Sequence, residues 1–427
     1  IGWTRIAKSS SGYYLLLLLA LSWTHLRDYA MSRHHGASLL PLANRCCAHA
    51  TAYSRLWRAL ATAAVDPASQ TAVLQSRGVL QAEGPQVLNF LQGIVTNDVR
   101  PLENAGPQQP PVYATILTPK GKFLHDVLIF PHPERPDSVL IDVDRSGAAA
   151  ALQLLNRYKL RRPITFRDVS SQFRVAACWG AAAQPPGPWW RPDPRRPELG
   201  FRGLLPASGP SAEQQGAGSG EEEYRALRYR LGVAEGEAEI PAGQAAPLDY
   251  NVDVLRGVSY SKGCYVGQER NSFTHYRGVI RRRLMPVRLE PLEQASSDSA
   301  AGPPSLACGA EVVDAASGRS VGQLRGTAGA TESGSSGARW GIAYLQLAAA
   351  LPAAEGRVDL RVAAAAAVGG EAGQAGEGVE KSAGTGAAAG PAEAGGSGVW
   401  RVVPVRPEWW PAEWGREEEA GRAGGSS

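Results

Sequence analysis

The sequence predicts an α+β fold that ends in a small β-barrel or sandwich, and three observations indicate it. At 427 residues the chain exceeds the length that one ordinary core organises, so two domains with added segments are expected. Between residues 71 and 158 the patterns follow the order strand, helix, hairpin, strand, helix, which is typical of a mixed α+β layer. After residue 283 the chain carries short strand-like segments, which favour a barrel or a sandwich.

The first domain is predicted to span residues 71–283. Apolar residues at Val87, Leu88, Leu91 and Ile94 recur at helical spacing, so one face of this segment is expected to be buried. Residues 184–222 are rich in Pro, Gly, Ser and Glu without periodicity, which predicts a loop insertion. The remaining elements expected in order are a strand at 72–80 with a turn at Arg77 and Gly78, a hairpin of 112–117 and 123–130, a strand at 138–143, and helices at 148–158 and 223–231.

The second domain is predicted to span residues 284–407. Gly-, Ala- and Ser-rich stretches at 294–304 and 363–398 interrupt it and are interpreted as low-complexity insertions. Residues 408–427 are expected to form a disordered tail. The expected strands are 284–289, 311–314, 320–326, 341–345, 357–362 and 399–405.

The first 70 residues are expected to be disordered and to include a targeting segment. The sequence starts at Ile1 and its first methionine is Met31. Residues 31–65 contain no Asp or Glu and carry four arginines among Ala, Leu and Ser, which is typical of an organelle transit peptide. An Ala-rich tail of chance composition is the alternative. The apolar run at 13–23 is too short to span a bilayer, so no membrane span is expected.

Charge and cysteine content exclude several classes of protein. The formal net charge of +4 is small for this length, so it does not demand a nucleic-acid partner. Five cysteines without CxxC spacing argue against a disulfide scaffold or a zinc site, and no metal site is predicted. A reducing compartment is expected. Cys178 and Cys308 are each interpreted as core residues.

The segment from Lys262 to Glu269 reads KGCYVGQE and contains the main candidate for chemistry, Cys264. Flanking glycines allow close backbone approach to a ligand. A nearby Lys262 favours the thiolate that nucleophilic or metal-binding chemistry requires. The alternative is that Cys264 is a small buried apolar residue.

This segment, with THYRGVIRRRL after it, resembles the signature of the folate-binding YgfZ and glycine-cleavage T-protein superfamily, including its mitochondrial iron–sulfur assembly branch. The stretch QGIVTND at 92–98 resembles the early element of that superfamily, and 119–126 resembles its Gly-containing hairpin. The resemblance covers about residues 71–290. It implies a T-protein-like fold of several subdomains with a C-terminal barrel.

The resemblance also implies site residues. Asp126 occupies the place of a carboxylate that assists methylene transfer in the glycine-cleavage enzymes, and Cys264 would contact an iron–sulfur cluster or a partner. Both are therefore the candidate catalytic residues, although Asp126 is otherwise a common type of solvated strand residue. His125 is expected on the opposite face of the strand. The residues implied in tetrahydrofolate binding are Asn97, Asp126, Arg228, Lys262, Gly263, Tyr265, Gly267, Gln268 and Glu269.

The sequence departs from the superfamily pattern directly after the motif. Arg270, Asn271, Ser272 and Phe273 stand where an aliphatic residue, Thr, Ala and Arg are more usual, so the basic contact expected at Phe273 is absent. Arg277 or the arginines at 281–283 are candidates to replace it.

Three functions are compatible with this pattern. The resemblance favours a tetrahydrofolate-binding assembly factor for [4Fe–4S] proteins of the mitochondrial matrix, with the plastid as the alternative compartment. Because a [4Fe–4S] cluster takes four thiolates, the single Cys264 implies a transient cluster shared with a partner such as an A-type iron–sulfur carrier or scaffold. The alternatives are a folate-dependent aminomethyltransferase or demethylase, and an interaction protein that keeps the fold as a scaffold.

Overall fold

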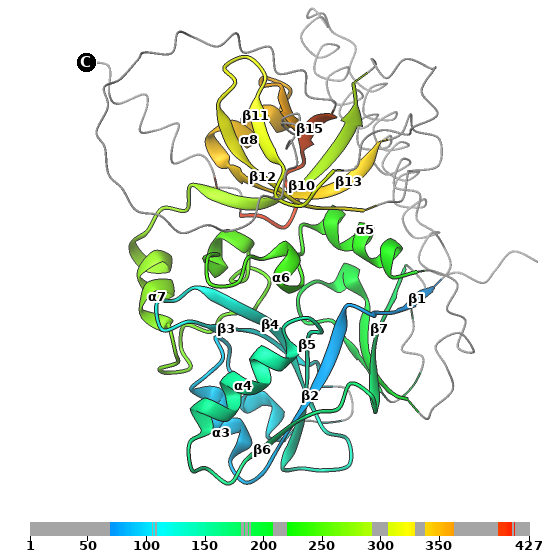
Figure 1. Ribbon diagram of the computed structural model, residues 1–427, viewed down its shortest axis with the longest axis vertical. Coiled ribbons are helices and arrows are strands. Elements are labelled where there is room, and N and C mark those ends of the chain that lie inside the picture. The colour runs from blue at the N-terminus through cyan, green and yellow to red at the C-terminus, as the bar shows by residue number, and fades with distance from the viewer. Residues whose placement is uncertain are drawn as a thin grey trace, which may run out of the picture. The chain divides into compact units, whose positions relative to one another are not determined.

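The computed structural model describes residues 69–104, 106, 109–180, 183, 187, 189–207, 220–292, 306–328, 338–362, 400–411 and 414. These residues belong to one compact unit, residues 66–427. The transit peptide predicted at 31–65 and the low-complexity insertions predicted at 294–304 and 363–398 lie outside the described residues. The described strands form two open antiparallel sheets and one closed barrel, which confirms the predicted α+β class with a C-terminal barrel (Figure 1).

The first sheet is buried on both faces. Alternate residues of each strand enter different apolar clusters: Val127 and Ile129 pack with the helices α3 and α4, whereas Leu128 and Phe130 pack on the other side. This explains why its strands are almost continuously apolar. The elements are β2 (Arg77–Glu83), α3 (Val87–Gln92), η1 (Arg100–Leu102), β3 (Val112–Leu117), β4 (Phe123–Pro131), β5 (Ser138–Asp144), α4 (Ala148–Lys159) and β6 (Thr165–Asp168), with strand order β3-β4-β5-β2-β6.

The predicted strand at 72–80 is two strands in different sheets. β1 (Gln70–Val73) pairs with the second sheet, and β2 begins at Arg77 after a turn at Gln75 and Ser76. The predicted turn at Arg77 and Gly78 is therefore wrong by two residues. The apolar residues on either side of the polar pair merge into one run in the sequence, which conceals the break.

The second sheet corrects the predicted loop insertion at 184–222. Within it lie β8 (Trp190–Pro192), η2 (Pro197–Leu199) and β9 (Phe201–Pro206), and the sheet order is β1-β7-β9-β8 with β7 (Phe173–Trp179). Pro192 and Pro206 end their strands, where a missing N–H matters least. A Cβ at Gly203 would come within 2.8 Å of the Trp190 ring, so the glycine allows this ring to pack flat on the sheet.

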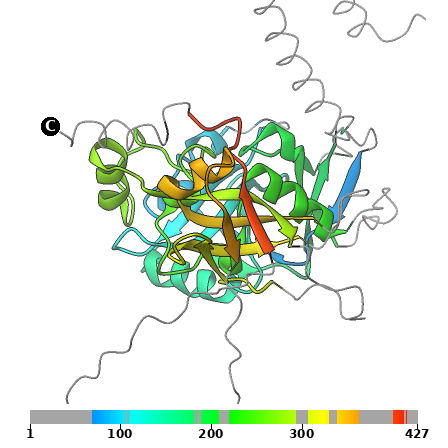
Figure 2. The same cartoon turned by 90° about the horizontal axis from the view of Figure 1, so that it is seen from above.

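The chain then forms α5 (Glu221–Leu231), α6 (Gly236–Glu239), η4 (Pro247–Tyr250) and α7 (Gln268–Arg277) before entering the barrel. Helix α5 packs against the barrel strands β10 and β13. Figure 2, which views the molecule from above, shows α7 at the edge of the described residues, as Figure 1 does.

The barrel closes in the order β10-β13-β12-β11-β14-β15 around an apolar core. Helix α8 was not predicted, because its sequence LAAALPAA contains Pro352. The predicted disordered tail at 408–427 begins too early, since Trp410 is buried in the barrel core. The elements are β10 (Arg282–Pro291), β11 (Glu311–Asp314), β12 (Ser320–Thr327), β13 (Arg339–Gln346), α8 (Leu347–Ala354), β14 (Leu360–Val362) and β15 (Trp400–Pro404). Within the described ranges, every helix is too short or too polar to cross a bilayer.

Candidate functional site

The Cys264 loop, defined as residues 259–267, is anchored by Lys262. The Lys262 side chain is buried, and its Nζ donates hydrogen bonds to the carbonyl oxygens of Val95 at 2.6 Å and Asn97 at 2.7 Å. Burial lowers the pKa of Lys262 to about 8. The ammonium thus holds the loop in place, and its expected effect on the Cys264 thiolate stays a prediction.

The two sequence motifs, 92–98 and 262–269, lie against each other. The backbone N–H of Val266 donates to the carbonyl of Gly93 at 3.1 Å, and that of Ser259 donates to the carbonyl of Thr96 at 3.0 Å. These bonds join segments about 165 residues apart into one layer. The resemblance of both segments to one superfamily therefore has a common structural reason.

Asn97 is a structural link in this layer. Its Nδ2 donates to the carbonyls of Tyr113 at 2.8 Å and Arg256 at 2.7 Å, and its Oδ1 accepts the N–H of Asp98 at 2.9 Å. Both amide protons are therefore in use, so a folate contact by Asn97 would go through its oxygen. That contact stays a prediction.

Gly267 places helix α7 against the β3–β4 hairpin. It has a φ of +80°, and a Cβ at this position would lie 2.4 Å from the carbonyl oxygen of Thr118. The hairpin has a glycine at the same contact, Gly121, and a Cβ at this position would lie 2.9 Å from the carbonyl oxygen of Gly267. Two glycines thus allow the backbones to meet, which explains the glycine of the 262–269 motif and that of the hairpin at 119–126 better than ligand contact does.

Replacing Gly267 with alanine is expected to destabilise the protein by about 2–4 kcal/mol, because conformational strain and a backbone clash add together. Gly356 is the matched control, since its φ of +78° is nearly the same but nothing lies within 4 Å of its Cβ position. Urea unfolding of both variants measures the difference. Equal losses for Gly267→Ala and Gly356→Ala would show that the contact with Thr118 is unimportant.

Cys264 is an exposed free thiol, so the alternative of a buried apolar residue is wrong. Gly263 beside it has a φ of +101° and open space around it. Tyr265 is buried, whereas Glu269 at the start of α7 is exposed and Gln268 is half-buried. Among the described residues, no group of three or more His, Cys, Asp or Glu side chains is placed to hold a metal ion.

The other two described cysteines differ from Cys264. Cys178 is buried in β7, as predicted, and burial raises the pKa of its thiol. Cys308 is exposed, which corrects the prediction of a core residue. Its Sγ lies 3.1 Å from the carbonyl oxygens of Ala238 and Arg325, so its thiol already has protein acceptors.

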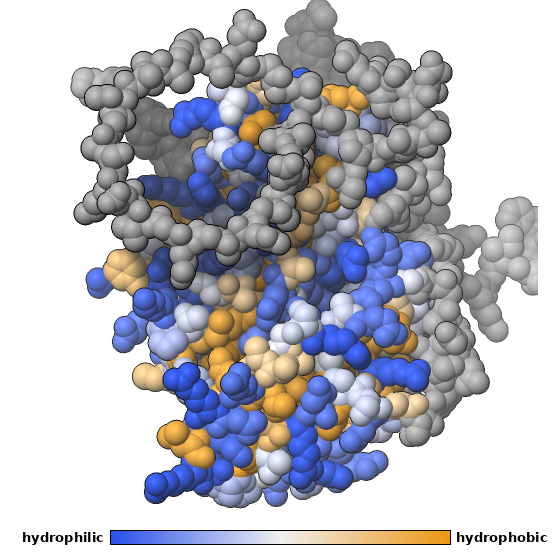
Figure 3. Space-filling model, in the orientation of Figure 1, coloured by the Kyte–Doolittle hydropathy of each residue, from blue (hydrophilic) through white to orange (hydrophobic). Residues whose placement is uncertain are grey.

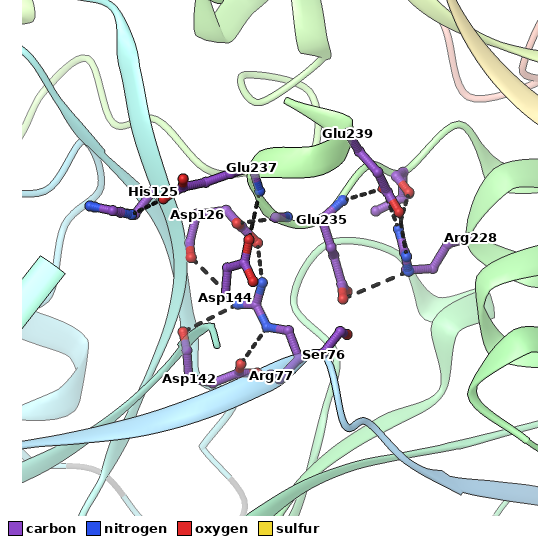
Figure 4. A network of polar contacts seen from close by, with 12 residues as sticks. Ser76, Arg77, His125, Asp126, Asp142, Asp144, Arg228, Glu235, Glu237 and Glu239 are labelled. Atoms are coloured by element: carbon purple, nitrogen blue, oxygen red, sulfur yellow. Dashed lines mark hydrogen bonds and ion pairs between the residues drawn. The ribbon is translucent and has the colours of Figure 1, made fainter. Parts of the chain in front are cut away.

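Asp126 belongs to a buried charge network (Figure 4). Its Oδ2 pairs with Nη1 of Arg77 at 2.9 Å, and its Oδ1 accepts the N–H of Gly236 at 3.0 Å. The side chain is fully buried, and His125 points away from it toward Glu237, as the strand alternation predicts. A ligand could reach Asp126 only after Arg77 or Gly236 moved, and its catalytic role stays a prediction.

Glu235 is the centre of the same network. Its Oε1 lies 2.6 Å from Arg195 and 3.2 Å from Arg202, and its Oε2 lies 3.7 Å from Nε of Arg228. Burial alone raises the pKa of Glu235, but Arg202, Arg195, Arg228 and Arg77 together hold it well below its ordinary value. Asp142 connects the part of the network around Asp126 with the part around Glu235, because it pairs with both Arg77 and Arg202.

Arg228 pairs with Glu239 through both Nη atoms, at 2.8 and 2.9 Å. This bidentate geometry is the one that an arginine would offer to a carboxylate of folate. A ligand carboxylate would have to displace Glu239 to form that pair. Arg228 as a folate contact therefore stays a prediction that needs rearrangement.

A cavity of about 350 Å³ lies beside the network. Arg225, Arg228 and Glu239 line it from α5 and α6, and Cys308 and Arg325 line it from the barrel side. Of the residues predicted to bind folate, Arg228 lines this cavity; the others do not, and Cys264 does not. The structure therefore separates the candidate site into a polar cavity and an exposed thiol loop.

The sequence pattern did not reveal the charge network, because its members are spread along the chain from Arg77 to Glu239. One signal was available. Asp142 stands between the buried Ile141 and Val143 of β5, and Arg202 stands in β9 two residues before the buried Leu204. A charged side chain inside such a strand requires a partner of opposite charge.

Comparison with curated proteins finds several mitochondrial relatives. "Iron-sulfur cluster assembly factor IBA57, mitochondrial" of Mus musculus is 33% identical over 270 residues, covering 59% of this chain and 73% of the relative. The Homo sapiens protein is 34% identical with the same coverage. The homolog of Mycosarcoma maydis is 35% identical over 264 residues, and this chain spans 63% of its length. A scan against protein-family models gives no match.

Among solved structures, the glycine cleavage system aminomethyltransferase T from Bartonella henselae is similar, with a TM-score of 0.52 at 13% identity, over 70% of this chain and 83% of that one. This similarity shows the T-protein fold. The fold that the motifs at 92–98 and 262–269 imply is thereby confirmed. Together with the identity to the mouse and human relatives, it follows that the chain belongs to the family of IBA57 mitochondrial iron–sulfur cluster assembly factors.

Proposed function

We propose that this chain is a tetrahydrofolate-binding factor that assists the assembly of [4Fe–4S] clusters on mitochondrial proteins. One observation carries the proposal: an exposed free thiol, Cys264, stands on a loop that Lys262 fixes to the domain. Relatives that are named as mitochondrial assembly factors support the process and the compartment. We assign the chain to the mitochondrial matrix. The plastid is the alternative compartment.

The cluster is the cargo, and Cys264 supplies one of its ligands. A [4Fe–4S] cluster takes four thiolates, so a partner must supply the rest. A thiol on a fixed, exposed loop can meet such a cluster without rearranging its own backbone, which lowers the entropy lost on docking. An A-type iron–sulfur carrier or a scaffold protein is the kind of partner that fits.

The polar cavity supports the proposal of tetrahydrofolate binding through its size and charge. Its volume of about 350 Å³ lies within the range of small-ligand pockets. Arg325 uses its Nε on the carbonyl of Glu239, and Arg225 uses Nη1 on Glu222, so each keeps further N–H groups for a glutamate carboxylate. When bound, the folate would offer a one-carbon carrier, while these arginines hold its anionic end.

The enzyme alternative depends on Asp126. An aminomethyltransferase or demethylase needs a carboxylate near the reacting nitrogens, whereas both oxygens of Asp126 are bonded inside the protein. This geometry favours an assembly factor. Folate-dependent turnover of a methylated amine by the purified chain would reverse that preference.

The proposal is tested by anaerobic gel filtration of the chain, of a cluster-loaded A-type carrier, and of their mixture, each with and without tetrahydrofolate. We expect the chain alone to hold no cluster and the mixture to give a complex that retains it. We also expect tetrahydrofolate to bind the chain, and tryptophan fluorescence measures this binding. A carrier that neither binds the chain nor shares its cluster would end the proposal.

A further inference from the structure

Helix α7 and its exit carry an unusual cluster of exposed apolar side chains. We name the α7 face the surface formed by Arg270, Phe273, Tyr276, Arg277, Val279, Arg281 and Arg282. Phe273, Tyr276 and Val279 are exposed by 63%, 67% and 58%. Leu160 is the other large apolar side chain of the described residues that is so exposed. Phe273 and Tyr276 are three residues apart and therefore share one side of the helix.

The α7 face is also strongly cationic. Its four arginines are exposed, and no ion pair among the described residues involves them. From Cys264 to Arg283 the sequence contains a single acidic residue, Glu269. Figure 3 shows apolar side chains among hydrophilic ones on the side of the molecule where α7 lies in Figure 1. Exposed aromatic residues among arginines are typical of protein interfaces.

An aromatic trio fixes this face relative to the Cys264 loop. Tyr260 of the loop stacks on His275 of α7, with ring centroids 3.7 Å apart and planes inclined by 13°. Tyr276 packs its edge against both, at 5.9 Å from Tyr260 and 4.8 Å from His275. These contacts fix the orientation of the exposed Tyr276 ring. A molecule that docks on this ring therefore has a defined position relative to Cys264.

A cleft of about 410 Å³ adjoins the α7 face. Val279, Ile280 and Arg281 line it together with Asp249 and Tyr344, which hydrogen-bond to each other at 2.8 Å. Such a recess beside exposed aromatic rings can receive an anchoring side chain of a partner. Cys264 lies four residues before α7, and a helix of ten residues is about 15 Å long, so the thiol and the face fall within one interface of about 800 Å² per partner.

We propose that the α7 face is the docking surface for the cluster-carrying partner, and that this partner presents an acidic surface with an apolar centre. This inference rests on the proposed function, because the partner it names is the one that shares the cluster with Cys264. A second copy of the chain fits poorly, since a two-fold contact through this face would bring the arginines of both copies together. Phe273, which is 63% exposed, adds apolar area at the centre of the face.

The test measures binding of a purified, acidic A-type carrier without its cluster to the full chain. Phe273→Ala and Tyr276→Ala should each weaken the affinity about tenfold or more, as removal of central aromatic contacts does. Leu160→Ala is the matched control, because Leu160 is 82% exposed but lies outside the face, and its effect should stay within about twofold. The double variant Arg270→Glu and Arg277→Glu should slow association and reduce its salt dependence, whereas Arg174→Glu on β7 should not.

The outcomes separate this inference from the proposed function. If Phe273→Ala and Tyr276→Ala bind the carrier like the wild type while Cys264→Ala loses the shared cluster, the proposed function stands and the docking surface is wrong. The docking surface is also wrong if Leu160→Ala weakens the affinity for the carrier as much as Phe273→Ala and Tyr276→Ala do. A concentration-dependent dimer of the chain that Tyr276→Ala dissociates would overturn it as well. If the wild-type chain binds only the cluster-loaded carrier, the docking surface is wrong and the proposed function stands; if it binds the carrier neither with nor without its cluster, both proposals fail together.

Discussion

Cells in which Cys264→Ala replaces the wild-type chain should lose aconitase activity to the level of cells without the chain, while the variant accumulates normally. The side chain is exposed and makes no hydrogen bond among the described residues, so its removal should leave the fold intact. Cys264 is, however, the one cysteine of this loop, so its removal leaves a shared cluster without one of its four ligands. Aconitase activity and the abundance of the variant are the two measurements.

Cys308→Ala is the matched control for this experiment. Cys308 is the other exposed cysteine of the described residues, but its thiol lies against two carbonyl oxygens at the polar cavity. Because the proposed folate contacts in this cavity are Arg225 and Arg325 and not the thiol, we expect Cys308→Ala to support aconitase normally. Full activity with Cys264→Ala would show that the thiol has no part in cluster assembly.

Glu235→Ala should destabilise the fold by about 3–5 kcal/mol, the cost of leaving buried charges without their partner. Arg195 and Arg202 are fully buried at this carboxylate, and neither can become neutral at ordinary pH. Glu355→Ala is the control, because Glu355 pairs with Arg357 at the surface and should cost less than about 1 kcal/mol. Urea unfolding at neutral pH compares the two, and equal losses would contradict the central place of Glu235.

The pH dependence of stability gives a second measurement on Glu235. The arginines hold its pKa in the folded state well below the ordinary 4.5, so the unfolded state binds more protons when the pH falls below that value. Its contribution to stability is therefore complete above about pH 4.5 and is lost as the pH falls toward the folded pKa. Glu235→Gln should flatten the fall in unfolding free energy between about pH 5 and pH 3.

Where the sequence predicted the fold correctly, local pattern and tertiary packing agree. The hairpin β3–β4 was found because two apolar strands flank a turn with Gly121, and the barrel was found because its strands are short and separated by loop-rich segments. The prediction of a loop at 184–222 was wrong. Prolines dominate the sequence pattern there, but Trp190 and β9 supply enough apolar surface for a sheet edge. Burial in the tertiary structure overrode local composition there.

The candidate site was predictable only in part. Composition and resemblance identified Cys264, and its exposure agrees with that choice. The sequence could not show that Lys262 bonds to carbonyls of the 92–98 segment, or that Gly267 makes room for Thr118, since both depend on contacts between distant segments. The aromatic trio of Tyr260, His275 and Tyr276 likewise becomes visible only once α7 folds back on the loop.

The most direct test of the central claim is the fate of the cluster when Cys264 is removed. The wild-type chain, Cys264→Ala and Cys308→Ala are each mixed anaerobically with a cluster-loaded A-type carrier, and the complexes are followed by gel filtration and visible circular dichroism. The claim predicts that wild type and Cys308→Ala retain the cluster in the complex, whereas Cys264→Ala binds the carrier but loses the cluster. A Cys264→Ala complex with an unchanged cluster spectrum would contradict it.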